Sequence, residues 1–382
     1  MGDIVSDIKE AACNLGFEVA GITNVEPLDA GLTALTAWCD AGMAAGMGYM
    51  TRNPALHANP SGLVPTSASL ISLAVNYFAE TPAFTHDNTY GRIARYAWGR
   101  DYHDVVRPRL LDLANQIRQI APGRETSGSG FSSRAFIDAV PLLERAVANR
   151  AGFGFFGKNT NLILPRRGSW FFLAEIFLNM ELPEDDNANR VSCGTCRRCL
   201  KGCPTDAFSG PYILDSSKCI SYLTIENKGP IPRELRSRVG EWLFGCDVCQ
   251  EVCPFNRFSS ETEWPELRPE AGPGTRIDLS SVLSIATDSE FRARFQGTCL
   301  MRPKRRGLLR NAAIVAANVG CEAALQTLIE RIENDPEALI RSHALWAAAR
   351  LDWSKVGRLV ELARTDPDQA VREEAELLLA ER

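Results

Sequence analysis

Eight of the twelve cysteines lie between positions 193 and 253, and their spacing carries the clearest chemistry in the chain. The first run begins at Cys193 and reads C-x-x-C-x-x-C-x-x-x-C-P; the second begins at Cys246 and reads C-x-x-C-x-x-x-C-P. Cys219 stands alone between them. Three thiolates two residues apart can bind three corners of one 4Fe–4S cube, while the fourth, followed by proline, points toward a second cube. The pattern therefore predicts two 4Fe–4S clusters, which transfer single electrons.

The ligands of the two clusters are expected to be crossed between the runs. One cluster would be bound by Cys193, Cys196, Cys199 and Cys253, and the other by Cys203, Cys219, Cys246 and Cys249. A zinc ribbon would use two C-x-x-C pairs and would not need proline after the last cysteine of both runs. A disulfide framework is typical of short secreted chains, whereas this chain is long and shows no signal peptide.

Length and composition set the wider limits. A chain of 382 residues can form two or three domains, and its 45% hydrophobic and 23% charged residues are typical of globular proteins. No apolar run approaches the roughly 18 residues that a membrane span needs. We therefore expect a soluble cytoplasmic protein with reduced thiols and no membrane partner. The net charge of −5 does not exclude a nucleic-acid partner, because a basic patch can lie on an acidic protein.

Residues 1–185 are predicted to form an α/β domain. This domain would hold the group that receives electrons from the clusters. Residues 69–78 and 170–178 are apolar enough for buried strands, and residues 101–120 have the period of an amphipathic helix. The strand Arg134–Asp138 would deliver Asp138 at its end, a typical place for a catalytic group. A carboxyl there could be a proton donor, although a helix-capping aspartate is the commoner reading of such a position.

Two further regions follow this domain. Residues 186–260 read as a ferredoxin-like domain for the two clusters, and residues 275–382 contain a repeat. Asp335-Pro and Asp366-Pro lie 31 residues apart, and so do Arg310, Arg341 and Arg372. This period predicts stacked HEAT-like helix pairs, which either bind a macromolecule or support the catalytic half. The fold class expected is thus a multidomain α+β protein with an all-α C-terminal part.

Other candidate residues give weaker signals. None of the four histidines forms a metal-binding H-E-x-x-H pair. Lys158 and Ser169 lie in glycine-flanked turns that could meet a polar ligand. Two basic runs, at 302–310 and 233–238, could contact phosphates or could be solvated faces.

Over nearly its whole length the chain resembles the epoxyqueuosine reductases. The resemblance rests on residues 95–103 (RYAWGRDYH), 137–146 (IDAVPLLERA), 150–159 (RAGFGFFGKN), 168–170 (GSW), 219–226 (CISYLTIE), both cysteine runs and the C-terminal repeat. It implies reduction of epoxyqueuosine to queuosine in the anticodon loop of tRNA, the last step of queuosine biosynthesis. It also implies cobalamin, bound by the N-terminal domain beside two 4Fe–4S clusters, and helical repeats that grip tRNA.

By the same resemblance, Asp138 is the catalytic proton donor and a cobalamin contact. His57, Lys158, Ser169 and Ser221 are the other residues implied near cobalamin or substrate. The family more often has Arg or Lys where His57 stands. The D-x-H-x-x-G signature of histidine-ligated cobalamin is absent, since Val106 replaces its glycine, and the family binds cobalamin without that ligand.

The expected partners are tRNA carrying epoxyqueuosine and an unidentified electron donor, and the chain is expected to be a monomer. Electrons would pass from the clusters to cobalamin while Asp138 protonates the departing oxygen. Two other functions fit the cysteines. A reductive dehalogenase would use the same cofactors on organohalides, and a ferredoxin-like electron carrier would have no catalytic site.

Overall fold

The computed structural model describes residues 4–82, 87–123, 126, 130–185 and 191–382. The expected start of the cluster domain, 186–190, lies outside these residues. The chain divides into two compact units, each built from separate segments. Unit 1 comprises Met1–Glu80, Arg100–Asp215 and Val248–Arg268, and unit 2 comprises Thr81–Gly99, Ser216–Asp247 and Pro269–Arg382. The division therefore differs from the three consecutive domains expected from sequence.

Unit 1 is built on a four-stranded sheet in the order β1-β2-β7-β4. Its strands are β1 (Val19–Asn24), β2 (Ser69–Asn76), β7 (Phe171–Leu178) and β4 (Ser133–Phe136). Every pairing in it is antiparallel. The N-terminal half is thus an α+β arrangement, and the α/β expectation is corrected: strands distant in sequence pair directly, without the helical crossovers of a parallel sheet.

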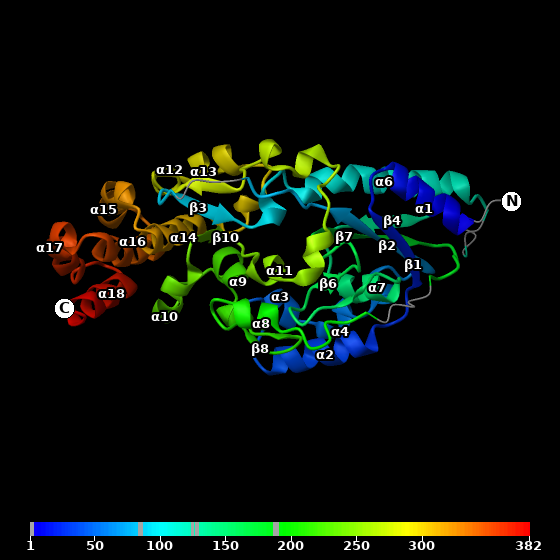
Figure 1. Cartoon of the computed structure of the whole chain (residues 1–382), viewed down its shortest axis with the longest axis horizontal. Helices are drawn as coiled ribbons and strands as arrows, with labels where there is room; N and C mark the ends of the chain where they lie inside the picture. The colour runs from blue at the N-terminus through cyan, green and yellow to red at the C-terminus, as the bar shows by residue number, and fades with distance from the viewer. Residues whose placement is uncertain (1–3, 83–86, 124–125, 127–129, 186–190) are drawn as a thin grey trace. The chain divides into compact units, whose positions relative to one another are not determined.

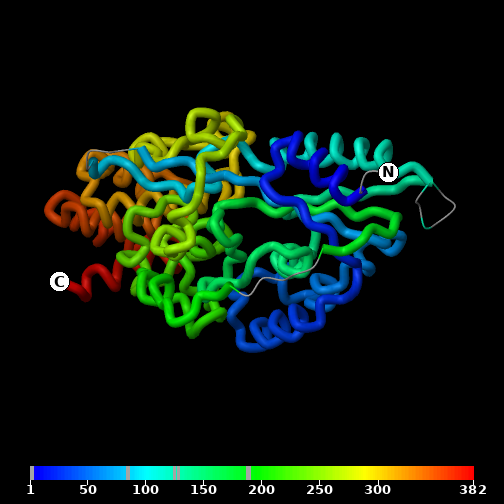
Figure 2. The backbone as a smooth tube through the Cα atoms, turned by 45° about the vertical axis from the view of Figure 1, so that its right-hand side comes forward, coloured from blue at the N-terminus to red at the C-terminus, as the bar shows by residue number. Residues whose placement is uncertain are grey.

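Helices cover both faces of this sheet (Figure 1). Helices α1 (Ile4–Asn14) and α6 (Tyr102–Ile120) pack beside each other on one face, as Figure 2 also shows. Helix α7 (Glu144–Arg150) packs on the other. Successive strand residues point to opposite faces, so the even-numbered residues of β2 and the odd-numbered residues of β7 face α7.

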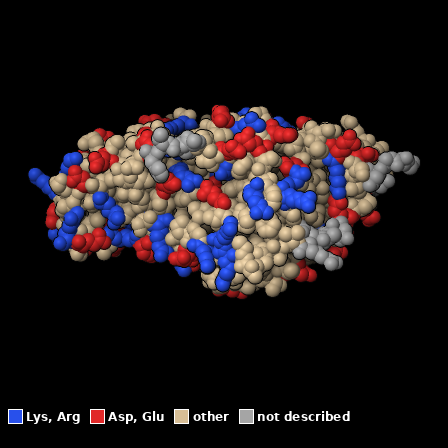
Figure 3. All heavy atoms as spheres, in the orientation of Figure 1, with Lys and Arg blue, Asp and Glu red and all other residues tan. Residues whose placement is uncertain are grey.

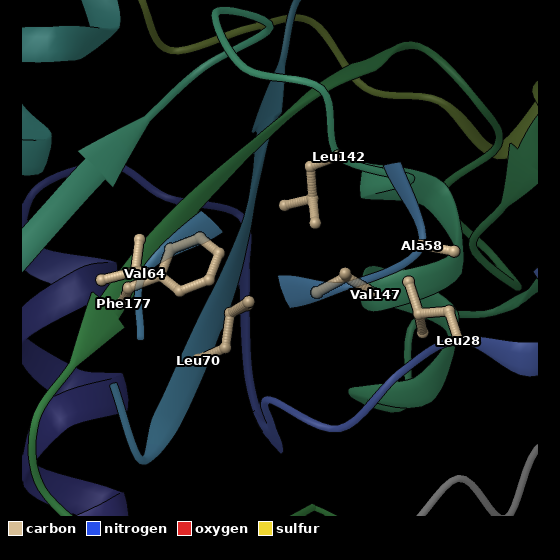
Figure 4. Close-up of a cluster of buried hydrophobic side chains, with 7 residues drawn as sticks. All are labelled: Leu28, Ala58, Val64, Leu70, Leu142, Val147 and Phe177. Atoms are coloured by element: carbon tan, nitrogen blue, oxygen red, sulfur yellow. The ribbon is translucent and has the colours of Figure 1, made fainter. Parts of the chain in front are cut away.

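The α7 face of the sheet carries a buried hydrophobic cluster (Figure 4). Its members are Leu28, Ala58, Val64, Leu70, Leu142, Val147 and Phe177. A second cluster, which includes Ala74, Ala148 and Leu173, lies further along the same strands. Each large apolar side chain buried here stabilises the fold by roughly 1.5–3 kcal/mol, which fixes α7 and the loop before it against the sheet.

Shorter elements complete unit 1. They are α2 (Asp29–Asp40), α3 (Gly48–Thr51), α4 (Pro54–His57), α5 (Pro60–Leu63), β5 (Phe155–Phe156), β6 (Leu162–Ile163), α8 (Arg198–Gly202), β8 (Phe208–Gly210), β9 (Ile213–Leu214), α11 (Val248–Glu251) and the 3₁₀ helix η4 (Pro254–Phe258). The cysteine runs lie on and beside α8 and α11, and these two helices pack together.

Unit 2 has a three-stranded sheet, β10-β3-β11, and most of the C-terminal helices. Its strands are β3 (Tyr90–Ile93), β10 (Trp242–Phe244) and β11 (Arg276–Asp278). Its helices are α9 (Ile220–Ile225), α10 (Arg233–Arg236), α12 (Leu279–Leu283), α13 (Asp288–Phe295), α14 (Lys304–Val319), α15 (Leu325–Asn334), α16 (Ala338–Leu351), α17 (Trp353–Ala363) and α18 (Gln369–Ala380). Helix α16 packs against α14, α15, α17 and α18.

The 31-residue repeat produces a repeated set of contacts. Arg341 Nη1 donates to the carbonyl oxygens of Asp335 and Pro336, at 2.9 and 3.2 Å. Arg372 Nη1 donates in the same way to Asp366 and Pro367, at 2.7 and 2.9 Å. In addition, the Arg341 guanidinium forms two hydrogen bonds with the Asp366 carboxylate. Each arginine thus ties the start of its helix to the preceding Asp-Pro turn.

Among the described residues, no helix is both long and apolar enough to cross a membrane.

Candidate functional site

Four cysteines expected to share a cluster gather in unit 1. Cys193 and Cys196 lie on the loop before α8, Cys199 lies in α8, and Cys253 immediately precedes η4. Burial raises the pKa of the Cys199 thiol, and the charges of Cys193 and Cys253 raise it further. Burial likewise raises the pKa of Cys253, with further contributions from Cys193 and Cys196. The four sulfur atoms are therefore near neighbours, and four cysteine sulfurs from two chain segments are the donors that an iron–sulfur cube requires.

No group of three or more His, Cys, Asp or Glu side chains in the described chain has the arrangement of a site for one metal ion. The other expected ligand set is divided between the units. Cys203 and Cys249 belong to unit 1, whereas Cys219 and Cys246 belong to unit 2.

Lys158 lies against the first cysteine loop. Its backbone N–H donates to Cys193 Sγ at 3.4 Å, and its Nζ donates to the carbonyl oxygens of Gly194 and Cys196 at 2.6 and 2.9 Å. An amide donor to a ligand sulfur and a nearby cation both stabilise a reduced iron–sulfur cluster. The structure therefore gives Lys158, expected near cobalamin, a direct contact with the cluster loop.

Ser169 is buried in an amide network with the second cysteine run. Its N–H donates to Asn256 Oδ1 at 2.7 Å, and its Oγ accepts from Gln250 Nε2 and Asn256 Nδ2, both at 3.1 Å. Gly168 precedes it with φ of +83°, and a Cβ there would lie 2.2 Å from Asn256 Oδ1. Only glycine lets the two segments approach so closely.

Asp138 follows strand β4 and is exposed, with a φ of +44°. Its Oδ2 accepts a hydrogen bond from the Tyr102 hydroxyl at 2.7 Å, and its N–H donates to Glu144 Oε1 at 2.8 Å. Tyr102 is itself held in place by stacking on Phe172, with ring centroids 4.1 Å apart. A carboxylate with one oxygen oriented by a phenol and the other able to carry a proton suits a general acid. A non-glycine residue in this backbone region is typical of functional sites.

No hydrogen bond described for the remaining expected residues reaches Asp138. His57 is buried at the end of α4, and its Nε2 lies 3.0 Å from the carbonyl oxygen of Tyr49. Ser221 lies in unit 2, on α9 directly after Cys219, and is partly buried. The contacts described here link Asp138 to Tyr102 and Glu144, and link Lys158 and Ser169 to the cysteine runs.

Sequence reasoning missed three residues around Asp138, namely Tyr102, Glu144 and Glu175. Glu175 is fully buried in the middle of β7. One signal was present: it is the only charged residue in the otherwise apolar strand FFLAEIFL. Tyr102 and Glu144 gave no comparable signal, because an aromatic residue and a glutamate are both ordinary at the start of a helix.

Several arginines of the two basic runs are buried and form bonds within unit 2. Arg310 is buried, and its guanidinium donates to the carbonyl oxygens of Leu223, Asn227 and Gly229. Burial lowers the pKa of Arg310 to about 9. Arg305 pairs with Asp335, and Arg236 with Glu374. Arg302, Lys304, Arg306 and Arg238 are exposed. Figure 3 shows basic and acidic side chains interspersed over the face drawn.

Two family models match the chain. Residues 192–256 match the 4Fe-4S double cluster binding domain, and residues 57–139 match "Epoxyqueuosine reductase QueG, DUF1730". The prediction of a two-cluster domain is thereby confirmed. The second match spans the segment from His57 to Asp138.

Curated relatives match over nearly the full length. An epoxyqueuosine reductase of Pseudomonas aeruginosa is 38% identical, over 91% of this chain and 94% of its own. An epoxyqueuosine reductase of Escherichia coli K12 is 33% identical, over 97% of this chain and 96% of its own.

Solved structures agree with this. A crystal structure of epoxyqueuosine reductase with an epoxyqueuosine-modified tRNA-Tyr stem loop superposes with a TM-score of 0.89, at 29% identity, over 99% of this chain and 98% of the other. A Bacillus subtilis epoxyqueuosine reductase, whose catalytic loop is swung out of the active site, gives a TM-score of 0.87, at 29% identity, over the same shares of both chains.

Proposed function

This chain belongs to the epoxyqueuosine reductase family of oxidoreductases, and we propose that it reduces epoxyqueuosine in the anticodon loop of tRNA with Asp138 as the proton donor. The observation that carries the proposal is the Tyr102–Asp138 pair, at the end of a segment that matches the family model. The reaction converts an epoxide to an alkene and releases water, so it takes up two electrons and two protons.

The clusters supply the electrons one at a time. We propose that Cys193, Cys196, Cys199 and Cys253 bind one cluster, since these thiols gather in unit 1. By the doubled motif, Cys203, Cys219, Cys246 and Cys249 bind the other. Lys158 would stabilise the reduced form of the first cluster by its charge and its N–H···S contact.

We further propose cobalamin as the cofactor that acts on the epoxide. When bound, cobalamin supplies a reducible cobalt that delivers the electrons to the substrate. Its rim carries amide groups, which polar side chains such as Lys158, Ser169 and Ser221 can bind, and His57 is the remaining contact proposed. Because Lys158 and Ser169 already bond to the cysteine runs, the same residues would hold cofactor and cluster loops together.

The role of Asp138 follows from its bonds. Tyr102 donates to Oδ2 and so fixes the plane of the carboxyl, and the second oxygen carries the proton toward the departing epoxide oxygen. The N–H bond to Glu144 holds the left-handed backbone that directs this side chain. Because Asp138 is exposed, substrate must cover it to exclude water during the transfer.

The test of this proposal is Asp138→Ala in protein with full iron and cobalt content. Loss of a general acid reduces a rate by about 10²–10⁴-fold, measured as queuosine formed in a tRNA stem loop by nucleoside mass spectrometry. Asp112→Ala, an exposed aspartate on α6, is the matched control and keeps the wild-type rate. Wild-type turnover by Asp138→Ala would refute the proton-donor role.

We propose that tRNA binds chiefly through its phosphates and a splayed loop base. The exposed residues Arg302, Lys304, Arg306 and Arg238 are the basic candidates. The contacts repeated at Arg341 and Arg372 support a HEAT-like tail for residues 275–382. The proposed catalytic part, 1–185, and the proposed cluster part, 186–260, each contribute segments to both compact units. A monomer in the cytoplasm, reduced by a separate electron donor, completes the proposal.

A further inference from the structure

Glu175 is a buried acid whose carboxyl oxygens accept no hydrogen bond from a donor group of the described residues. It pairs in register with Ser72 of β2 and Phe136 of β4, and it lies on the sheet face that α7 covers. Its exposed fraction is 0%, and neither carboxyl oxygen receives a hydrogen bond from a donor group of the described chain. An ionised carboxylate in such a place would cost several kcal/mol, so the site favours the protonated acid.

The side chain that Glu175 meets is a second carboxyl, that of Glu144. Two carboxyls bond to each other only when at least one of them carries a proton. Burial, and then the charge of Glu144, raises the pKa of Glu175 well above its ordinary value. Burial, and then the charge of Asp138, raises the pKa of Glu144 to about 8. The raised pKa of each carboxyl favours a proton held between the two.

The surroundings keep this proton in place. Val147 and Phe177 belong to the hydrophobic cluster on one side of the pair, and Ala148 and Leu173 to the cluster on the other. The charges that act on Glu175 are those of Glu144 and Asp138, and both are negative. Arg145 favours ionised Glu144, but its guanidinium bonds to the carbonyl oxygen of Thr160 at the exposed surface.

The pair also touches the proposed acid. Glu144 Oε1 accepts the N–H of Asp138 at 2.8 Å. Glu175, Glu144 and Asp138 thus form a sequence of three carboxyl-bearing residues from the middle of the sheet to the exposed loop. Glu175 is buried, Glu144 is half-buried and Asp138 is exposed.

The stoichiometry of the reaction gives this arrangement a use. Reduction of the epoxide breaks two C–O bonds, forms a C=C bond and releases water, so two electrons and two protons are consumed. The clusters provide the electrons. Asp138 carries only one proton, and a bound tRNA would cover its exposed side.

We propose that Glu144 and Glu175 form a proton-storing pair that recharges Asp138 with the second proton of each turnover. This inference rests on the proposed role of Asp138. After Asp138 gives its first proton to the epoxide oxygen, Glu144 transfers a proton to the Asp138 carboxylate and Glu175 passes its own to Glu144. Asp138 then gives the second proton and water leaves. Once the product has gone, solvent returns one proton to the pair and one to Asp138. Glu144 and Glu175 are positioning and proton-supplying residues, since neither needs to touch the substrate.

The test uses single turnovers of reduced, cofactor-loaded protein with an epoxyqueuosine tRNA stem loop. Glu144→Gln keeps the oxygen that accepts the Asp138 N–H but holds no exchangeable acid proton. We expect this variant to slow the second protonation about tenfold or more. In the wild type, loss of the stored proton should lower the rate above about pH 8, and the variant should lack this decline. Glu175→Gln should slow the reaction in the same direction. Glu181→Gln, an exposed glutamate, should leave both the rate and the pH profile unchanged.

Infrared spectroscopy gives a readout that does not depend on turnover. The wild-type protein should show the carbonyl band of a protonated carboxyl at neutral pH, and Glu175→Gln should lose it. Wild-type rates and pH profiles in both Gln variants, or the absence of that band in the wild type, would overturn the inference. Asp138→Ala separates the two proposals. If Asp138→Ala is slow while Glu144→Gln has the wild-type rate, only the proton-storing pair is refuted. If Asp138→Ala has the wild-type rate, the proton-donor role of Asp138 is refuted.

Discussion

The protonation of Glu175 should make the stability of the protein depend on pH. Burial raises the pKa of this carboxyl well above its ordinary value. Above the ordinary glutamate pKa the unfolded chain releases the proton while the folded chain keeps it, so the free energy of unfolding falls as pH rises toward the folded pKa. Below the ordinary pKa both states bind the proton, and the stability that it contributes is fully present.

The size of the effect follows from the proton count. One extra proton held by the folded state changes the free energy of unfolding by about 1.4 kcal/mol per pH unit. Between the ordinary glutamate pKa and the raised pKa of the folded state, the wild type should therefore lose up to about 1.4 kcal/mol per pH unit that Glu175→Gln does not lose. Groups remote from Glu175 titrate alike in both proteins and cancel in the difference, whereas Glu144, whose carboxyl meets Glu175, adds its own change.

The assay is anaerobic urea denaturation of cluster-loaded protein at several pH values, followed by far-ultraviolet circular dichroism. Glu175→Leu should also gain stability relative to the wild type at the alkaline end, because it removes a buried acid that has no donor. Glu181→Gln should follow the wild-type slope. Parallel curves for the wild type and Glu175→Gln would show that the buried carboxyl is ionised in the fold, contrary to the reasoning above.

Three further predictions concern other contacts. Lys158→Met removes a cation that bonds to Gly194 and Cys196 and should lower the reduction potential of the first cluster, measured by anaerobic redox titration with electron paramagnetic resonance; an unchanged potential would remove Lys158 from the cluster environment. Gly168→Ala places a Cβ against Asn256 and should cost about 1–2 kcal/mol from its positive φ alone, measured by denaturation; a neutral effect would mean that the amide network can move aside. Arg341→Ala breaks the bonds to Asp366 and should cost about 1.5–3 kcal/mol, whereas Arg364→Ala, at an exposed i,i+3 pair, should change stability by less than about 1 kcal/mol.

Much of the fold could be predicted from the sequence where a single pattern dominates. The apolar run from residue 69 is strand β2, and the periodic stretch 101–120 is helix α6, whose apolar face is buried. The antiparallel pairing could not be predicted, because buried central strands read alike in either orientation. The sequence also predicts a strand over 92–98, but β3 ends at Ile93 and a 3₁₀ helix begins at Arg95.

The candidate site was predictable only in part. Cysteine spacing is a local property, so the two-cluster domain could be predicted from the sequence alone, while the assignment of each cysteine to a cluster stays a prediction. The surroundings of Asp138 depend on residues far apart in the chain: Tyr102 lies 36 positions before it, and Glu175 reaches Glu144 only because β7 pairs beside β4 under α7. The burial of Arg310 could not be predicted for the same reason, since its carbonyl partners lie more than 80 positions away in the sequence.

The Asp-Pro turns of the C-terminal repeat have a consequence for how this tail can change in length. Asp366 accepts the guanidinium of Arg341 through its side chain and that of Arg372 through its carbonyl oxygen. One turn therefore joins α16 and α18 on either side of α17, and the Asp335 turn is used in a similar way, by Arg305 through the side chain and by Arg341 through the carbonyl oxygen. A further period that carried both the Asp-Pro turn and the arginine would bring its own pairing partners, so we expect this end of the tail to accept an added helix pair without new contacts elsewhere.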